Sequence, residues 1–268
     1  MPQIVHWNPH LRLRPSGVLW RVRRFDRENN FGDLLGPWIV ARVVSTLRLG
    51  RAVSSRDRLL AVGSIINLVA REGDVVWGAG IHGNHLPLAD PIPPLDVRAV
   101  RGPSTAAVLR GCGINVPAVF GDPALLIPHL WADAELGIRR RTGGTVIVPN
   151  YYDFANAPQN SLNPRGDMLT RVRAIASAER VIASSLHGIV VAEAYGVPAT
   201  LVASSSEKLF KYEDYYGGTG RTLPPIAPDW QSAADTPACE PISHWAPEPL
   251  LEAFPADLWR VAVGQSRT

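Results

Sequence analysis

A histidine at residue 187 lies in a sequence pattern suited to acid–base chemistry. Residues 181–198 read VIASSLHGIVVAEAYGVP. The apolar run before the two serines predicts a strand, and the apolar run after them predicts a helix that ends at Gly196 and Pro198. Residues 199–203 predict another buried strand, so the stretch reads as a βαβ unit of a parallel sheet. His187 would then lie in the first turn of the helix, at the carboxyl end of a strand, where open α/β sheets bind ligands.

The start of this helix is also suited to anion binding. The free backbone N–H groups after Ser184 and Ser185, together with the helix dipole, attract a phosphate or a carboxylate. The same field favours neutral imidazole, and a bound anion would reverse that preference and let His187 hold a proton. A histidine whose charge follows an anionic substrate is a good general acid or base. The alternative is that His187 caps the helix or packs within the turn.

Three cations follow other predicted strands. Arg101 ends the predicted strand 96–100 and precedes a helix that Gly102-Pro103-Ser104 opens. Its guanidinium matches a carboxylate or a phosphate in bidentate geometry, and a plain salt bridge to an acidic neighbour is the alternative. Lys208 and Lys211 follow the βαβ unit and could point ammonium groups at the same anion. We expect all three cations to bind an anionic ligand.

A glycine-rich loop, GAGIHG at residues 78–83, matches the dinucleotide-binding pattern G-x-G-x-x-G. That pattern needs a following helix to hold a pyrophosphate, and four prolines between residues 87 and 94 exclude one. Glycines at a strand end, Gly80 among them, would instead let a sugar or an anion approach backbone N–H groups. His82 would project into the same cleft, or it is a loop histidine without a role.

The hydrophobic pattern predicts two successive α/β halves that position these residues. We expect residues 1–17 to be irregular and Asp33 to cap a helix over 34–47. The other expected elements are strands at 18–25, 59–62, 74–77, 118–120 and 145–149, and helices at 64–72 and 167–178.

The chain divides into four segments on this reading. A first lobe covers 1–132, a linker 133–144 and a second lobe 145–221, and a Pro-rich tail covers 222–268. A terminal helix in the tail could pack back on the first lobe. Two α/β halves joined by a linker imply a cleft between them, which is a preferred place for ligands.

Composition and charge are ordinary for a soluble globular protein. The 268 residues are 46% hydrophobic and 19% charged, with a net charge of +3 and scattered basic residues, so we expect no nucleic-acid partner. No apolar run reaches about 18 residues, so no membrane span is expected. The two cysteines fit neither a disulfide scaffold nor a zinc site. We expect a cytoplasmic protein without metal or cofactor, and the basic clusters at 21–24 and 139–141 leave peripheral membrane contact open.

Five motifs, in order along residues 29–216, together resemble the polysaccharide pyruvyl transferase family. They are Asn30-Phe31-Gly32-Asp33, Val100-Arg101-Gly102-Pro103-Ser104, Gly121-Asp122-Pro123-Ala124, Ser185-Leu186-His187-Gly188 with Gly196-Val197-Pro198, and KLFKYEDYY at 208–216. Each motif alone is weak, whereas the ordered set is fairly specific. Some members carry arginine at the position of Ser185, and the form with serine is most similar to the bacterial exopolysaccharide ketal-pyruvate transferases.

The resemblance implies two Rossmann-like lobes whose parallel sheets face a cleft, as in GT-B glycosyltransferases. It implies transfer of pyruvate from phosphoenolpyruvate onto two hydroxyls of a sugar, as a cyclic ketal, in an exopolysaccharide or its lipid-linked repeat unit at the inner membrane face. His187 and Arg101 are the expected catalytic residues. The expected substrate-binding residues are Asn30, Asp33, Gly80, His82, Ser104, Asp122, Ser184, Ser185, Lys208 and Lys211.

Two other functions stay open. A GT-B glycosyltransferase would use a nucleotide sugar, although the sequence has no Asp-x-Asp motif for a metal-bound nucleotide. A non-catalytic sugar- or anion-binding relative would bind the donor without releasing phosphate. Ser185 in place of arginine keeps that second reading open, because charge neutralisation of the donor then depends on other cations.

Overall fold

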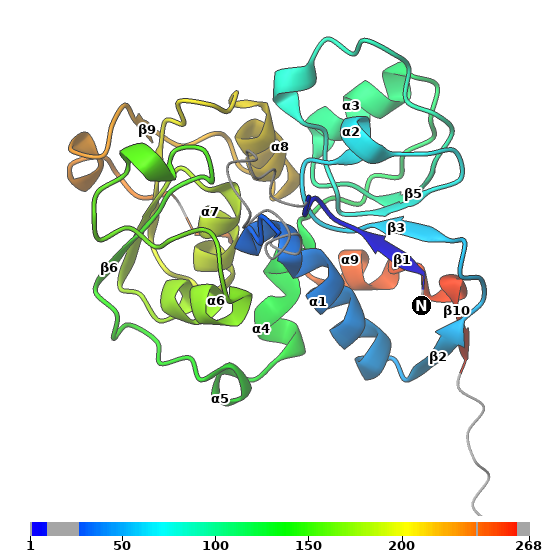
Figure 1. Ribbon diagram of the computed structural model, residues 1–268, viewed down its shortest axis with the longest axis horizontal. Coiled ribbons are helices and arrows are strands. Elements are labelled where there is room, and N and C mark those ends of the chain that lie inside the picture. The colour runs from blue at the N-terminus through cyan, green and yellow to red at the C-terminus, as the bar shows by residue number, and fades with distance from the viewer. Residues whose placement is uncertain (1, 10–26, 240, 262–268) are drawn as a thin grey trace, which may run out of the picture.

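The computed structural model describes residues 2–9, 27–239 and 241–261. Within them the chain is an α/β protein with two four-stranded parallel sheets and a two-stranded antiparallel ribbon (Figure 1). The expected α/β class with parallel sheets is confirmed. The strand expected over 18–25 lies outside the described residues. None of the described helices combines the length and the apolar sequence that crossing a membrane requires.

The first sheet has the strand order β1-β3-β4-β5, and its neighbouring strands are all parallel. Three of its strands confirm hydrophobic runs read from the sequence, whereas β1 lies in the segment expected to be irregular. That expectation is wrong because a three-residue strand is too short to show an alternating pattern. The elements of this half are β1 (Gln3–Val5), α1 (Phe31–Thr46), β2 (Leu49–Ala52), β3 (Arg58–Leu60), α2 (Ile66–Val69), β4 (Val75–Trp77), β5 (Asp96–Ala99) and α3 (Pro103–Gly111), with 3-10 turns η2 (Gly83–His85) and η3 (Pro123–Leu126).

The second sheet has the strand order β6-β7-β8-β9, again parallel throughout. Short helices α4 and α5 precede it, and α5 lies in the segment expected to be a linker. The elements are α4 (Ile127–Leu130), α5 (Asp133–Leu136), β6 (Thr145–Val148), η4 (Phe154–Asn156), α6 (Met168–Ala176), β7 (Arg180–Ala183), α7 (Leu186–Ala194), β8 (Ala199–Val202), α8 (Phe210–Gly218) and β9 (Ile226–Ala227).

The βαβ unit expected around His187 is confirmed as β7, α7 and β8. β7 and β8 are parallel, with Val181 opposite Ala199. α7 ends before Gly196, whose φ of +66° lies in the left-handed region that glycine adopts without strain. The strand, the turn and the helix are therefore all dictated by local sequence.

Helix α1 begins one turn earlier than the sequence pattern indicates. Asn30, in extended conformation, occupies the N-cap position, and Asp33 lies inside the first turn. The expectation that Asp33 caps the helix is therefore wrong. Its carboxylate accepts a hydrogen bond from the Asn30 side-chain amide at 2.6 Å, instead of one from a backbone N–H group. Both side chains consequently lie at the start of α1.

One hydrophobic cluster joins helices of both halves. It includes Phe31 and Leu35 of α1, Leu126 of η3, and Ile189 and Val190 of α7, all fully buried. Because buried side chains pack at close to crystal density, α1, η3 and α7 hold fixed positions relative to one another. This packing sets the place of His187 relative to the start of α1.

The C-terminal segment contacts the first sheet rather than the second. The short helix α9 (Glu248–Glu252) and the 3-10 turn η6 (Ala256–Leu258) lead to β10 (Trp259–Val261), which pairs with β2 (Figure 1). The indole N–H group of Trp77 on β4 donates to the Leu250 carbonyl at 2.7 Å. A short helix and a strand thus replace the single helix expected at the C-terminal end.

The glycine-rich loop after β4 is not followed by an α-helix. The chain continues into η2 and reaches its next α-helix only at Pro103, in a stretch that is fully described. Rejection of the dinucleotide pattern is therefore confirmed.

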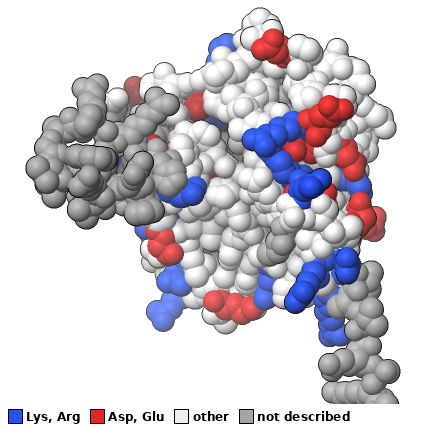
Figure 2. All heavy atoms as spheres, turned by 45° about the vertical axis from the view of Figure 1, so that its right-hand side comes forward, with Lys and Arg blue, Asp and Glu red and all other residues white. Residues whose placement is uncertain are grey.

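Charged side chains of both signs share the surface. On the face in Figure 2, basic and acidic residues are interspersed among larger uncharged areas. On β5, Arg98 contacts Asp96 at 2.7 Å and Asp257 at 2.9 Å. The positive net charge is therefore not gathered into one field on that face.

Candidate functional site

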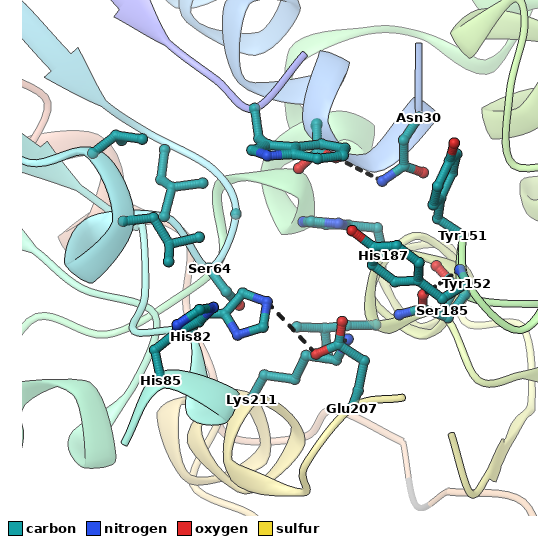
Figure 3. Close-up of a pocket in the computed structure, with 18 residues that line it drawn as sticks. Asn30, Ser64, His82, His85, Tyr151, Tyr152, Ser185, His187, Glu207 and Lys211 are labelled. Atoms are coloured by element: carbon teal, nitrogen blue, oxygen red, sulfur yellow. Dashed lines mark hydrogen bonds and ion pairs between the residues drawn. The ribbon is translucent and has the colours of Figure 1, made fainter. Parts of the chain in front are cut away.

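A pocket of about 420 Å³ lies where the start of α1, the loops after β3 and β4, the loop after β6, and the starts of α7 and α8 converge (Figure 3). Six of the residues expected to form a site line it, and no lysine or arginine other than Lys211 does so among the described residues. Its lining residues are Trp7, Asn30, Asp33, Gly63, Ser64, Ile65, Leu68, Val69, His82, His85, Asn150, Tyr151, Tyr152, Ser185, Leu186, His187, Glu207 and Lys211.

His187 lies in the first turn of α7 and points into the centre of the pocket (Figure 3). The Ser185 hydroxyl caps the helix by accepting a hydrogen bond from Gly188 N–H at 3.2 Å. Gly32 on α1 packs so closely that a Cβ atom there would lie 2.4 Å from Nδ1 of His187. The glycine of the Asn-x-Gly-Asp motif therefore makes room for the imidazole.

A buried carboxylate lies behind the imidazole. Asp122 Oδ2 is 3.5 Å from His187 Nε2, and the Asp122 side chain is 1% exposed. Asp122 Oδ1 accepts a hydrogen bond from Ala124 N–H, so the turn of η3 fixes the carboxyl group. Within the described residues, neither Nε2 nor Oδ2 has a hydrogen-bond partner. A carboxylate in this place orients the ring and favours the tautomer with a proton on Nε2.

A second carboxylate, Asp33, lies near His187 on the α1 side of the pocket. Burial raises the pKa of Asp33, while His187 and the hydrogen bond from Asn30 act in the opposite direction. A carboxyl group with a raised pKa can accept a proton and hold it longer than an exposed aspartate can. The pocket thus contains two adjacent groups capable of proton transfer.

Lys211 supplies the cationic side of the pocket. Its Nζ atom is 3.2 Å from Glu207 Oε2, which in turn is 3.9 Å from Nε2 of His82. Burial lowers the pKa of Lys211, and the neighbouring Glu207 opposes that change. Burial lowers the pKa of His82 in the same way. Glu207 therefore links a histidine of the first half to a lysine of the second (Figure 3).

Arg101 lies behind the pocket wall rather than in it. The side chain is 1% exposed, and its Nε donates to Asp214 of α8 at 2.9 Å. The other guanidinium nitrogens donate to the Ser64 hydroxyl at 2.6 Å and to the Ile81 carbonyl at 3.1 Å. Gly80 packs against the guanidinium, because a Cβ atom at Gly80 would lie 2.4 Å from Cζ. The sequence left open whether Arg101 binds an anionic ligand or forms a salt bridge with an acidic neighbour. In the structure it forms the salt bridge, with Asp214.

The other expected site residues outside the lining have structural contacts. Ser184 donates to the buried carboxylate of Asp153 at 2.7 Å, and Ser104 lies in the first turn of α3. Lys208 is exposed, and its Nζ is 3.4 Å from the Leu86 carbonyl. Together with Gly80, Arg101 and Asp122, these three do not line the pocket, whereas Asn30, Asp33, His82, Ser185, His187 and Lys211 do.

Several lining residues lie outside every motif found in the sequence. Tyr151 and Tyr152 follow β6, and Glu207 follows β8, so each lies beyond the carboxyl end of a strand in a parallel sheet. A polar or aromatic residue directly after a predicted strand of a parallel sheet is the sequence signal that could have identified them. Tyr215 and Tyr216 of the KLFKYEDYY motif are buried instead, and both hydrogen-bond to Glu193.

No metal site accompanies this pocket in the described part of the chain, where no three His, Cys, Asp or Glu side chains are grouped to hold an ion. The side chains that line the pocket are suited to proton transfer and anion binding. His187 and Asp33 are suited to the first, and Lys211 and the N-terminus of α7 to the second.

Comparison with known proteins identifies the family of the chain. Residues 12–206 match the polysaccharide pyruvyl transferase family. The succinoglycan biosynthesis protein ExoV of Rhizobium meliloti (strain 1021) is 30% identical over 214 residues, which cover 74% of this chain and 64% of ExoV. The matched region therefore spans just under two thirds of the length of that curated relative. The family match covers most of the chain and includes the turn that carries His187, and the chain belongs to the polysaccharide pyruvyl transferase family.

Proposed function

We propose that this protein transfers pyruvate from phosphoenolpyruvate onto two hydroxyls of a sugar, forming a cyclic ketal. The observation that carries the proposal is His187 at the N-terminus of α7, in one pocket with Asp33 and Lys211. Family membership supports pyruvyl transfer. The name of the relative, a succinoglycan biosynthesis protein, supports an acceptor in an exopolysaccharide or its lipid-linked repeat unit.

The donor would bind between α7 and α8. Its phosphate and carboxylate need cations or hydrogen-bond donors, and the pocket offers the Lys211 ammonium, the His82 imidazole and the first backbone N–H groups of α7. Arg101 and Lys208, the other cations expected to bind the donor, do not line the pocket. We therefore assign Arg101 a positioning role, because it holds Ser64 on one side and α8, the helix of Lys211, on the other.

Ketal formation adds one proton to the methylene carbon of phosphoenolpyruvate. It removes one proton from each of the two sugar hydroxyls. Protonated His187 gives its proton to the methylene carbon, which becomes a methyl group. The first sugar hydroxyl bonds to the central carbon and loses its proton to Asp33. The bond from that carbon to the phosphate oxygen then breaks, and phosphate leaves with the proton held by Asp33. The second hydroxyl closes the ketal and returns a proton to His187.

Asp122 would position His187 for these steps. Its carboxylate lies beside Nε2, on the buried side of the ring, so Nδ1 remains for exchange with the substrate. General acid–base catalysis of this kind contributes about 10²–10⁴-fold in rate. Preorganised charges at the donor should contribute at least as much.

We also propose a two-lobed architecture for the chain and a location at the inner face of the membrane. The two sheets are taken as two lobes of a GT-B-like fold, with the first at 1–132, a linker at 133–144, the second at 145–221 and a tail at 222–268. The pocket, lined by residues of both halves, is taken as the cleft between them. A lipid-linked acceptor would place the protein in the cytoplasm at the inner membrane face.

The test is phosphate release from phosphoenolpyruvate in the presence of a panel of methyl hexosides, followed by mass measurement of the sugar. We expect phosphate release only with a suitable acceptor, and a sugar whose mass increases by pyruvic acid less one water. Turnover of a nucleotide sugar instead would favour a glycosyltransferase. Donor binding without phosphate release for any acceptor would favour a non-catalytic relative.

A further inference from the structure

Three aromatic side chains form one side of the pocket. Trp7, Tyr151 and Tyr152, here called the aromatic wall, all line it. The rings of Trp7 and Tyr151 are 6.4 Å apart at 71°, and those of Tyr151 and Tyr152 are 5.1 Å apart at 89°. The tyrosines lie across the pocket from His82 and His85 (Figure 3). Tyr152 is 57% exposed, so a large ring face is open to the pocket.

The wall is held in place by contacts behind it. The Tyr151 hydroxyl donates to Glu28, and the Arg165 guanidinium lies over the Tyr151 ring at 5.7 Å from its centre. The backbone N–H group of Tyr152 donates to the Asn150 side chain at 3.0 Å, and Asn150 N–H donates to the Ser184 hydroxyl at 2.9 Å. The rings are therefore preorganised rather than loose on a loop, which lowers the entropy cost of binding.

The charges around the pocket distinguish the wall from the opposite side. Lys211 lies on the opposite side with its partner Glu207 and with His82, whereas Glu28 lies behind the wall with its partner Arg165. Burial, followed by the hydrogen bond to Glu28, raises the pKa of Tyr151 to about 12, so its hydroxyl stays neutral. Aromatic ring faces carry negative potential. Lys211 lines the pocket, whereas Arg165 does not, so a donor with several negative charges is favoured near Lys211 rather than at the wall.

A sugar ring meets the requirements of the wall. A hexopyranose is uncharged, presents a face of C–H groups with positive character, and carries hydroxyls around its rim. Asn30 and Asp33 also line this pocket and can accept or donate hydrogen bonds to such hydroxyls. His187 lies beside Tyr152 in Figure 3, so a sugar on the wall would present its hydroxyls to the reacting donor.

We propose that the aromatic wall is the acceptor subsite, on which the hexopyranose ring stacks its C–H face, with Tyr152 as the main stacking residue. This inference rests on the proposed pyruvyl transfer, for which it assigns the acceptor side of the pocket. It uses residues that neither the five sequence motifs nor the chemistry of His187 involve.

The test compares Tyr152→Ala with Tyr152→Phe in steady-state assays that vary donor and methyl hexoside separately. We expect Tyr152→Ala to raise KM for the hexoside roughly 3- to 10-fold, the range of a lost aromatic contact, with KM for phosphoenolpyruvate unchanged. Tyr152→Phe keeps the ring and should behave as wild type. Leu47→Ala is the matched control, because Leu47 is 49% exposed at the far end of α1.

Two results would overturn the subsite. One is an unchanged hexoside KM in Tyr152→Ala, and the other is an equal rise in KM for the donor. If the wild-type protein makes no ketal product, pyruvyl transfer fails independently of the subsite. Saturation-transfer NMR with the methyl hexosides then decides the subsite alone. It stands if the wild type binds a hexoside and Tyr152→Ala binds it more weakly, and it falls if the wild type binds none or both bind equally.

Discussion

The turns at Arg101 and His187 have the same local structure, but one is covered by the rest of the fold and the other is open. In each, a parallel strand ends and a helix begins: β5 leads through Arg101 to α3, and β7 leads through Ser185 to α7 and His187. The His187 turn opens onto the pocket. The Arg101 turn is covered by α8, whose Asp214 backbone oxygen would lie 1.7 Å from a Cβ atom at Gly102.

The carboxyl end of a strand can bind a ligand only if no other element packs over it, as α8 does over the Arg101 turn. Asp214 lies 113 residues beyond Arg101, and it also accepts hydrogen bonds from the backbone and hydroxyl of Thr105. Arg101 is thereby used inside the fold to hold α8, and α8 carries Lys211 into the pocket. We therefore expect changes at the His187 turn to act on turnover and changes at the Arg101 turn to act on stability.

The largest effect should come from His187→Ala. Loss of the proton-transfer group should lower kcat by about 10²–10⁴-fold, measured as phosphate release with donor and acceptor saturating. The melting temperature should stay close to that of the wild type, because the ring borders the pocket and its Nε2 makes no hydrogen bond to the described residues. Substantial residual turnover would remove His187 from the role proposed above.

Arg101→Met should act on the folded state instead. It leaves the buried carboxylate of Asp214 without its guanidinium, which should lower the free energy of unfolding by about 3–5 kcal/mol in urea titrations. The double variant Arg101→Met/Asp214→Asn removes the uncompensated charge and should recover part of that loss. An unchanged free energy of unfolding in Arg101→Met would show that Arg101 does not stabilise the fold, and the contrast between the turns would fail.

Two glycines provide a matched pair of smaller changes. In Gly32→Ala the new methyl group pushes on His187, so we expect turnover to fall up to about 10²-fold through misplacement. The loss of stability should be smaller than at Gly80, because alanine is favoured over glycine in a helix by about 1 kcal/mol, which offsets part of the overpacking. In Gly80→Ala the methyl group meets the Arg101 guanidinium, and overpacking should cost about 1–3 kcal/mol of unfolding free energy. Equal effects of both variants on stability would contradict the comparison.

The smallest effect should come from Asp33→Asn in the pocket, with Asp214→Asn beside Arg101 as the variant of opposite sign. Burial raises the pKa of Asp33, so its contribution to stability is fully present below its unfolded pKa and is lost as pH rises through the folded value. Asp33→Asn should therefore raise the melting temperature at pH 8, and the gain should shrink as pH falls toward 4. Asp214→Asn should lower the melting temperature at pH 8. A destabilised Asp33→Asn protein at pH 8 would show that the ionised carboxylate has a stabilising partner.

The sequence pattern predicted the parts of the site whose conformation is set by neighbouring residues in the chain. The unit from β7 to β8 and the place of His187 follow from an apolar run, two serines and a glycine, all within 23 residues. The partners of Arg101 and His187 could not be predicted in this way, because Asp214 and Asp122 are distant in the chain. The aromatic wall was missed because Tyr151 and Tyr152 lie in a polar loop with no periodic pattern, and Trp7 follows a strand too short to recognise.

The pairing of the C-terminal segment with the first half has a consequence for synthesis on the ribosome. The Trp77 indole has its hydrogen-bond acceptor only when Leu250 has been synthesised. Strand β2 has its partner only when β10 has been synthesised, more than 200 residues later. The first sheet can therefore be assembled early, but its outer packing is completed only after residues 250–261 have been translated. A nascent chain that stops before residue 250 would expose the Trp77 edge, where chaperones could bind it.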